Sequence, residues 1–113
     1  MDCLFCNIIT QKIKTPFVYE DSEIVAFNDI SPKAPHHVLI VPKKHIATLN
    51  DLQPEDTMLI GKLVQTAKKI ASDLNIAEPG YRVLMNCNKE GGQAVYHIHL
   101  HLLGGRHLRW PPG

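Results

Sequence analysis

The stretch from residue 96 to residue 103 reads Tyr-His-Ile-His-Leu-His-Leu-Leu, in which histidine and an aliphatic residue alternate. Alternation with period two is typical of a β-strand, whose successive side chains point to opposite faces of a sheet. The pattern predicts a strand with an aliphatic face, which must pack on another apolar surface, and a face of three imidazoles about 7 Å apart. The aliphatic residues are Ile98, Leu100 and Leu102, and the histidines are His97, His99 and His101.

A long amphipathic helix is the expected partner of that aliphatic face. Apolar residues recur at spacings of three and four after Pro54, which suits a first helical turn, and the segment ends before Pro79-Gly80. These apolar positions are Leu59, Ile60, Leu63, Val64, Ala67, Ile70, Ala71 and Leu74.

The other strand-like runs complete an antiparallel sheet. Runs at 17–20 and 24–28 flank a polar turn and predict a hairpin, and runs at 37–42 and 81–86 predict two further strands. A short helix is expected at 3–9 and a glycine-containing loop at 89–93. We therefore expect one α+β domain over residues 1–113, a five-stranded antiparallel sheet with one main helix.

Charge and cysteine content narrow the possible partners and location. The 12 Lys and Arg residues nearly balance 11 Asp and Glu residues, which gives no electrostatic case for binding nucleic acid or an anionic membrane. No apolar run approaches the roughly 20 residues that span a bilayer, and no signal-peptide pattern is visible. The three cysteines then suggest a reduced, intracellular protein, which we expect in the cytoplasm, or in the nucleus of a eukaryote.

The row of three histidines could simply be a polar face of the sheet. It also has two chemical interpretations, a metal site and a catalytic site. A straight strand separates His97 from His101 by about 13 Å, so three histidines can hardly share one zinc ion. The alternative is acid–base and nucleophilic chemistry at phosphorus, for which a neutral imidazole is well suited near pH 7. Backbone N–H groups at Gly91-Gly92, with the amides of Gln93 and Asn86, could then stabilise phosphate charge.

At this point the chain resembles the histidine-triad (HIT) family, and within it the Hint branch. The segment 97–103 matches the signature of alternating histidine and apolar residues, and further matches lie at 27–35, 38–46, 91–93 and 110–113. The resemblance implies a hydrolase that cleaves the P–N bond of adenosine and other purine 5′-phosphoramidates, without an organic cofactor. It also implies a homodimer in which two sheets join into one of ten strands.

The resemblance assigns roles to individual residues. It implies that His99 is the nucleophile, forming a nucleotidyl-histidine intermediate, that His101 binds the transferred phosphate and that His37 supports the triad. It gives the ribose hydroxyls to Asp29, and it places Trp110 near the partner subunit's site. The implied base pocket is Phe5, Ile8, Phe27 and Leu39, and the phosphate side is Asn86, Gly92, Gln93, Ala94 and Val95.

Two of these assignments have alternatives. Phe27 and Leu39 could simply be core residues. Ala94 stands where many Hint enzymes have a serine that can hydrogen-bond the leaving nitrogen, which favours a nucleotide sensor or scaffold with weak hydrolase activity as the second hypothesis.

A metal site is suggested by the pair Cys3-x-x-Cys6. The pair alone is half a zinc site. In family members that carry it, the remaining ligands correspond to His45 and His97, so the resemblance implies structural Zn²⁺ held by Cys3, Cys6, His45 and His97. The alternative is two small buried thiols on a helical turn, and a zinc-dependent interaction protein is a further possible role.

Overall fold

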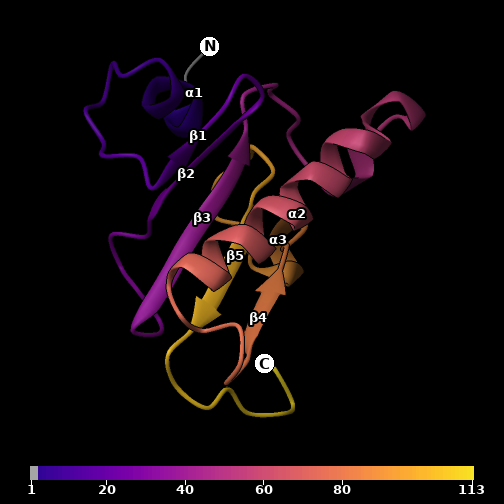
Figure 1. Ribbon diagram of the computed structural model, residues 1–113. Coiled ribbons are helices and arrows are strands. Elements are labelled where there is room, and N and C mark those ends of the chain that lie inside the picture. The colour runs from indigo at the N-terminus through magenta and orange to yellow at the C-terminus, as the bar shows by residue number, and fades with distance from the viewer. Residues whose placement is uncertain (1–2) are drawn as a thin grey trace.

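The computed structural model describes residues 3–113, and residues 1 and 2 of the expected domain lie outside the described residues. Helices and strands follow the predicted order closely (Figure 1). The helices are α1 (Leu4–Ile9), α2 (Thr57–Asp73) and α3 (Asn88–Gly91), and two 3₁₀ turns cover Leu49–Asp51 and Pro54–Asp56. The strands are β1 (Tyr19–Glu20), β2 (Ile24–Asn28), β3 (His36–Pro42), β4 (Tyr81–Leu84) and β5 (Leu100–Gly104).

The five strands form one antiparallel sheet in the order β1-β2-β3-β5-β4. β3 and β5 lie at the centre, and their register pairs Leu39 with His101 and Ile40 with Leu100. The predicted α+β architecture with one main helix is therefore confirmed. No helix within residues 3–113 is both long and apolar enough to cross a membrane.

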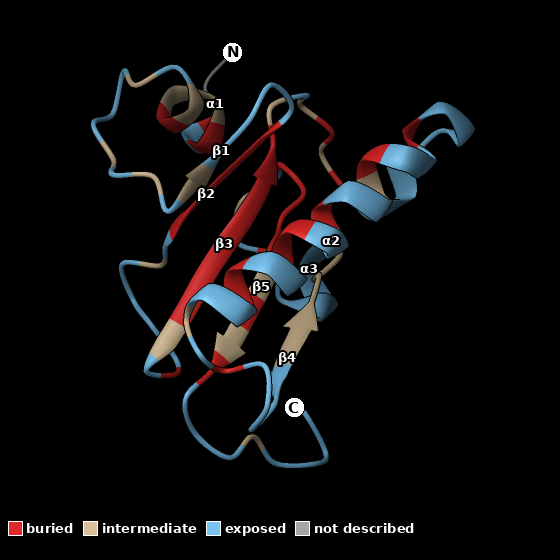
Figure 2. Ribbon diagram, in the orientation of Figure 1, coloured by how far each residue is buried: buried red, intermediate tan, exposed pale blue. Residues whose placement is uncertain are grey.

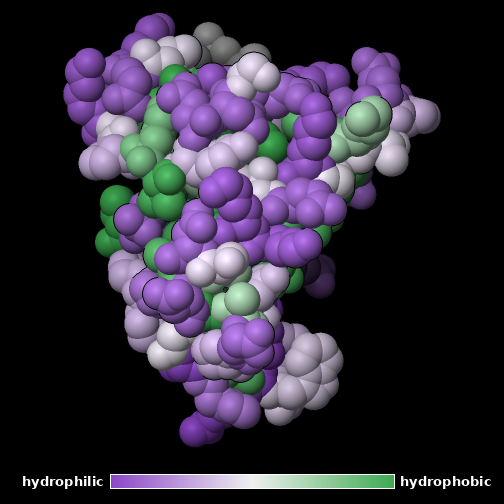
Figure 3. All heavy atoms as spheres, viewed as in Figure 1, coloured by the Kyte–Doolittle hydropathy of each residue, from purple (hydrophilic) through white to green (hydrophobic). Residues whose placement is uncertain are grey.

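Each face of the sheet has its own apolar cluster. On one face, Ile40, Leu100 and Leu102 pack with the buried side of α2, including Leu63 and Ile70. Figure 2 shows this buried stripe of α2 turned toward the sheet, while the outer side of the helix is exposed. Figure 3 views the same side and shows mostly hydrophilic side chains with small hydrophobic areas among them.

The opposite face is covered by α1. Phe5 and Ile8 on this short helix pack with Val25, Phe27 and Leu39 of β2 and β3. The histidines of the alternating segment also belong to this second face, because Ile98, Leu100 and Leu102 between them point into the α2 cluster.

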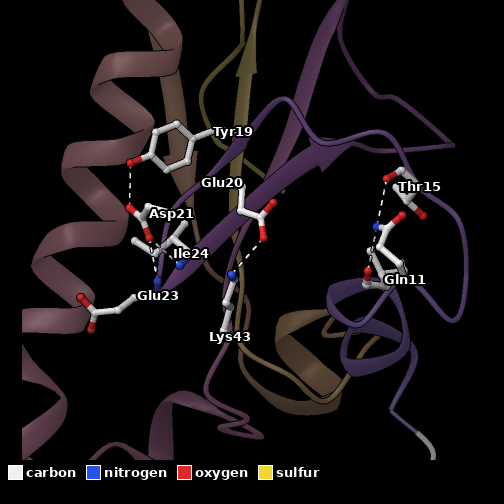
Figure 4. A network of polar contacts seen from close by, with 9 residues as sticks. Gln11, Thr15, Tyr19, Glu20, Asp21, Glu23, Ile24 and Lys43 are labelled. Atoms are coloured by element: carbon white, nitrogen blue, oxygen red, sulfur yellow. Dashed lines mark hydrogen bonds and ion pairs between the residues drawn. The ribbon is translucent and has the colours of Figure 1, made fainter.

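The first hairpin is held by a polar turn (Figure 4). Asp21 accepts hydrogen bonds from the backbone N–H groups of Glu23 and Ile24, at 2.7 and 2.8 Å, and from the Tyr19 hydroxyl at 2.7 Å. Lys43, the residue after β3, pairs with Glu20 of β1 at 2.9 Å. These contacts fix the register of the predicted hairpin, although β1 has only two residues.

Five local expectations were wrong. The first strand begins at Tyr19, not at residue 17, and the last strand begins at Leu100, not at residue 96. β4 ends at Leu84, not at residue 86. The expected loop at 89–93 contains the short helix α3, and Val64 of α2 is 51% exposed, away from the core.

Candidate functional site

The histidines of the predicted row lie on the α1 face of the sheet but differ in their surroundings. His97 and His99 precede β5 and are buried, whereas His101 lies within β5 and is half-buried. The ring centroids of His99 and His101 are 4.9 Å apart, closer than a straight strand would place them. The row therefore forms a compact cluster with His37 of β3, whose ring centroid lies 5.2 Å from that of His101.

The tautomer of His99 is set by a backbone carbonyl. Its Nδ1 lies 2.7 Å from the carbonyl oxygen of His97. Since a carbonyl oxygen only accepts, Nδ1 must carry the proton and donate it. Nε2 of His99 is then the unprotonated nitrogen, with its lone pair available as a nucleophile.

His37 and His101 form a second chain with a fixed direction. The backbone N–H of Lys33 donates to Nδ1 of His37 at 3.1 Å, so the proton of His37 is on Nε2. That Nε2–H donates to Nδ1 of His101 at 2.9 Å. His101 must therefore carry its own proton on Nε2, where it can be donated to a ligand.

Asp29 adds a carboxylate at the edge of this chain. One oxygen lies 3.5 Å from Nε2 of His37, and the other accepts the Ser31 backbone N–H at 2.8 Å. Asp29 is partly exposed, so its carboxylate can still accept hydrogen bonds from a ligand.

Burial keeps the histidines of the cluster neutral. Loss of hydration lowers the pKa of His99 and of His37 below the usual value. Burial, reinforced by neighbouring His99 and His37, lowers the pKa of His101 to about 4. At neutral pH the cluster therefore combines an imidazole lone pair on His99 with an imidazole N–H on His101.

The predicted base pocket gathers beside His99. The Phe5 ring meets His99 edge-on with centroids 4.9 Å apart, and meets Phe27 at 5.5 Å. Ile8 and Leu39 are buried in the same cluster, and Val95 packs at its margin.

Other predicted contacts lie in different settings. The Gln93 side chain is buried and bound to the protein itself: its amide N–H₂ donates to the carbonyls of Ala47 and Val95, and its carbonyl accepts the Asn88 N–H. Gly92 and Ala94 are exposed and Asn86 is half-exposed. Trp110 is 80% exposed and lies over Arg82 of β4, with the guanidinium 6.0 Å from the ring centroid.

The four predicted metal ligands do converge. Cys3, Cys6, His45 and His97 each place one ligand atom within 4.8 Å of the others. Three of the four Sγ to Nδ1 distances are 3.4 to 3.6 Å, and the two Nδ1 atoms are 3.1 Å apart. A tetrahedron with ordinary zinc bond lengths has S···N edges of about 3.5 Å and N···N edges of about 3.3 Å.

The chemistry of the donors also fits a metal ion. Nε2 of His97 donates to the carbonyl oxygen of Pro42 at 2.7 Å, so its Nδ1 is unprotonated and faces the two sulfurs. Cys3 is the N-cap of α1, and its Sγ accepts the backbone N–H of Cys6 at 3.3 Å. The four residues can therefore hold a metal ion in tetrahedral Cys₂His₂ coordination. The His97 ring is already oriented for this, because its other nitrogen is hydrogen-bonded to Pro42.

Sequence reasoning missed the backbone groups that orient the rings. The carbonyls of His97 and Pro42 and the N–H of Lys33 carry no residue-specific signal, because every non-proline residue has both groups. Pro42 offered one clue, since a proline ends a strand ladder and leaves its carbonyl available.

Comparison with known proteins agrees with this geometry. The family model described as scavenger mRNA decapping enzyme C-term binding matches residues 2–109. The purine nucleoside phosphoramidase of Escherichia coli K12 is 50% identical over 107 residues, 95% of this chain and 90% of that protein. The chain belongs to the histidine-triad family.

Solved structures of the HIT family share the fold. A HIT family hydrolase from Legionella pneumophila superposes with a TM-score of 0.97 and 54% identity, covering 99% of this chain and all of the other. A histidine triad protein from Clostridium difficile gives a TM-score of 0.93 with 41% identity, covering 96% and 95% of the two chains. A HIT-like protein from Synechococcus elongatus is 47% identical over 112 residues, which are 99% of this chain and 97% of that protein.

Proposed function

We propose that this HIT protein hydrolyses the P–N bond of purine nucleoside 5′-phosphoramidates. One observation carries the proposal: a buried imidazole with an unprotonated Nε2, His99, lies beside an imidazole that presents an Nε2–H, His101. The 50% identity to the purine nucleoside phosphoramidase of Escherichia coli supports the same substrate class.

The proposed reaction has two steps. Nε2 of His99 attacks the α-phosphorus while the Nε2–H of His101 hydrogen-bonds the phosphate oxygens, and the P–N bond breaks as the nitrogen, protonated from solvent water, leaves as the amine. Water then attacks phosphorus, the bond to His99 breaks and the water proton passes to the solvent. The net reaction consumes one water and releases nucleoside monophosphate and amine.

The surrounding residues support binding of the substrate in this scheme. His37 holds His101 in the donor tautomer through its Nε2–H, and Asp29 accepts hydrogen bonds from the ribose hydroxyls. Phe5, Phe27 and Leu39, with Ile8, form an apolar wall for the base. The exposed glycine Gly92, with Asn86, Ala94 and Val95, is proposed to line the phosphate side, whereas the bound amide of Gln93 favours a supporting role there.

Adduct trapping tests the nucleophile. The protein is mixed with an adenosine phosphoramidate and quenched without acid, and peptides are analysed by mass spectrometry. We expect a mass increase of one AMP group on the peptide that contains His99. A full rate of hydrolysis with no adduct at His99 under single-turnover conditions would refute the scheme.

We further propose that Cys3, Cys6, His45 and His97 hold a structural zinc ion. The bound ion would link α1 to the loops before α2 and β5, while the reacting histidines keep their own partners. Thiolate ligands need a reducing compartment, so the proposal includes an intracellular, cytoplasmic location. Elemental analysis of the purified protein tests it, with about one zinc per chain expected.

A homodimer is proposed through the sheet edge. β4 is an outer strand of four residues, so pairing of two copies there would give ten continuous strands. Trp110 lies on the same edge over Arg82, close to where a partner would join. Sedimentation analysis should give twice the mass of the 12.7 kDa chain.

A nucleotide sensor with weak hydrolase activity is the second candidate. It is favoured by Ala94, which offers no hydroxyl to a leaving nitrogen. An Ala94→Ser variant distinguishes the two: a rate that rises by orders of magnitude would indicate a sensor, and a rate within about tenfold an enzyme.

A further inference from the structure

The His99 ring is held by one residue of the metal cluster, His97, and by Phe5, which lies between the two cysteines of the cluster in the sequence. One contact is the hydrogen bond from Nδ1 to the carbonyl of His97, which is itself a predicted ligand. The other is the edge contact with Phe5, which lies between Cys3 and Cys6 on α1. Both supports of the ring therefore reach back to the same four-ligand site.

The backbone that carries the His97 carbonyl lies outside the sheet ladder. β5 begins at Leu100, so no sheet ladder holds the peptide plane that carries the His97 carbonyl and the Ile98 N–H. That plane is held instead by the Ile98 N–H, which donates at 2.8 Å to the carbonyl of Ile46, the residue after the predicted ligand His45. The His97 ring adds one bond to Pro42 and otherwise faces the cluster.

We infer that the Cys3/Cys6/His45/His97 site, when it holds its metal ion, positions the His99 ring in addition to stabilising the fold. The ion fixes the His97 ring, and thereby the carbonyl that selects the Nδ1–H tautomer of His99. It also fixes α1, and thereby the Phe5 edge against the same ring. The inference rests on the proposed function only in naming His99 as the nucleophile.

The test compares zinc-loaded and zinc-depleted protein at the level of the His99 ring. Cys3 and His45 line an open surface cleft of about 500 Å³, so a chelator can reach the site. Nitrogen-15 NMR of the histidine rings reports the tautomer directly. In the loaded protein we expect His99 as the Nδ1–H form alone, and in the depleted protein a mixture of both tautomers, with His37 unchanged.

Kinetics give a second reading. Zinc depletion, or a Cys6→Ser variant, should slow single-turnover transfer to His99 at saturating substrate about 10- to 100-fold. Cys87→Ser is the matched control, because this half-buried thiol lies outside the cluster. If folded, zinc-depleted protein keeps the His99 tautomer and the rate of transfer to His99 unchanged, the ion has a structural role alone and the inference is overturned.

A cobalt measurement decides the case in which depleted protein fails to fold. Coupling between two sites is reciprocal, so removing the His99 ring should disturb the metal. Cobalt-loaded His99→Ala should show shifted visible absorption bands, and cobalt-loaded His107→Ala should not. Unshifted bands in His99→Ala would overturn the inference. Neither tautomers nor cobalt bands require turnover, so failure to hydrolyse a phosphoramidate would refute the proposed function separately.

Discussion

At the scale of single residues, the roles of His99 and His101 as hydrogen-bond acceptor and donor depend on which ring nitrogen holds the proton. Backbone groups decide this, because a carbonyl can only accept and an amide N–H can only donate. The carbonyl of His97 leaves Nε2 of His99 with a lone pair, and the Lys33 N–H gives His101 its Nε2–H through His37. Acceptor and donor are thus assigned before a substrate arrives.

Replacement of His99 should abolish hydrolysis of the substrate while AMP still binds. His99→Ala is expected to lower kcat for an adenosine phosphoramidate by at least about a thousandfold, since no other lone pair replaces Nε2. The Kd for AMP, measured by calorimetry, should change little. His107→Ala is the control, because His107 is exposed outside the cluster; a His99→Ala enzyme with near-normal kcat would contradict the assignment.

Acid should destabilise the fold through His101. Its pKa falls from 6.5 to about 4 on folding, so between those pH values the unfolded chain binds the proton that the folded chain does not. The free energy of unfolding should therefore fall as pH drops from about 6.5 to about 4, and be fully retained above that range. The measurement is urea unfolding at successive pH values. His101→Asn should reduce the slope, to which His99 and His37 also contribute because burial lowers their pKa values, and His107→Asn should leave the slope unchanged.

At the scale of elements, the alternation of histidine and aliphatic residues predicted the faces of the last strand but not its start. The side chains of residues 97–99 keep the predicted alternation, with Ile98 in the α2 cluster. The ladder nevertheless stops at Leu100, because the facing residue two positions on in β3 is Pro42, which has no N–H to donate. Side-chain periodicity thus survives where backbone pairing ends.

The helix prediction failed at one position for a related reason. Spacings of three and four put Val64 on the apolar face, but its side chain is 51% exposed, whereas Leu63, Ala67 and Ile70 beside it are buried against the sheet. Which borderline position points to the sheet depends on how α2 sits across it, and that is a property of tertiary packing.

Two alanine substitutions on α2 should show this difference. Leu63→Ala removes a fully buried side chain and should lower the free energy of unfolding by about 2–5 kcal/mol, through lost contacts and a cavity. Val64→Ala next to it should change that free energy by less than about 0.5 kcal/mol. Denaturant unfolding measures both, and equal losses would contradict the observed orientation of the helix.

At the scale of the whole molecule, the predicted metal site joins three segments that are distant in the sequence. Cys3 and Cys6 come from α1, His45 from the segment after β3, and His97 from the segment before β5. The candidate ligand set was accessible from the sequence through family resemblance alone. Their convergence could not be computed from spacing, since it depends on the sheet bringing residues 45 and 97 together.

Metal removal should lower thermal stability. An ion present at about 100 times its Kd contributes about 2.7 kcal/mol to folding, which corresponds to a Tm difference of roughly 10 °C for a domain of this size. Calorimetry with and without chelator should show that difference in the unmodified protein and in Cys87→Ser, but not in Cys3→Ser. A Tm that does not respond to chelation in any of them would contradict a bound structural ion.

The sheet also acts as a partition. The larger buried cluster lies on the α2 side, whereas Phe5, Phe27 and the histidine cluster lie on the other. If Phe27 and Leu39 contact a base as proposed, exchanging them would leave the layer beneath α2 intact. Proteins that evolve from such a chain could change which ligand they bind without changing the hydrophobic core between α2 and the sheet.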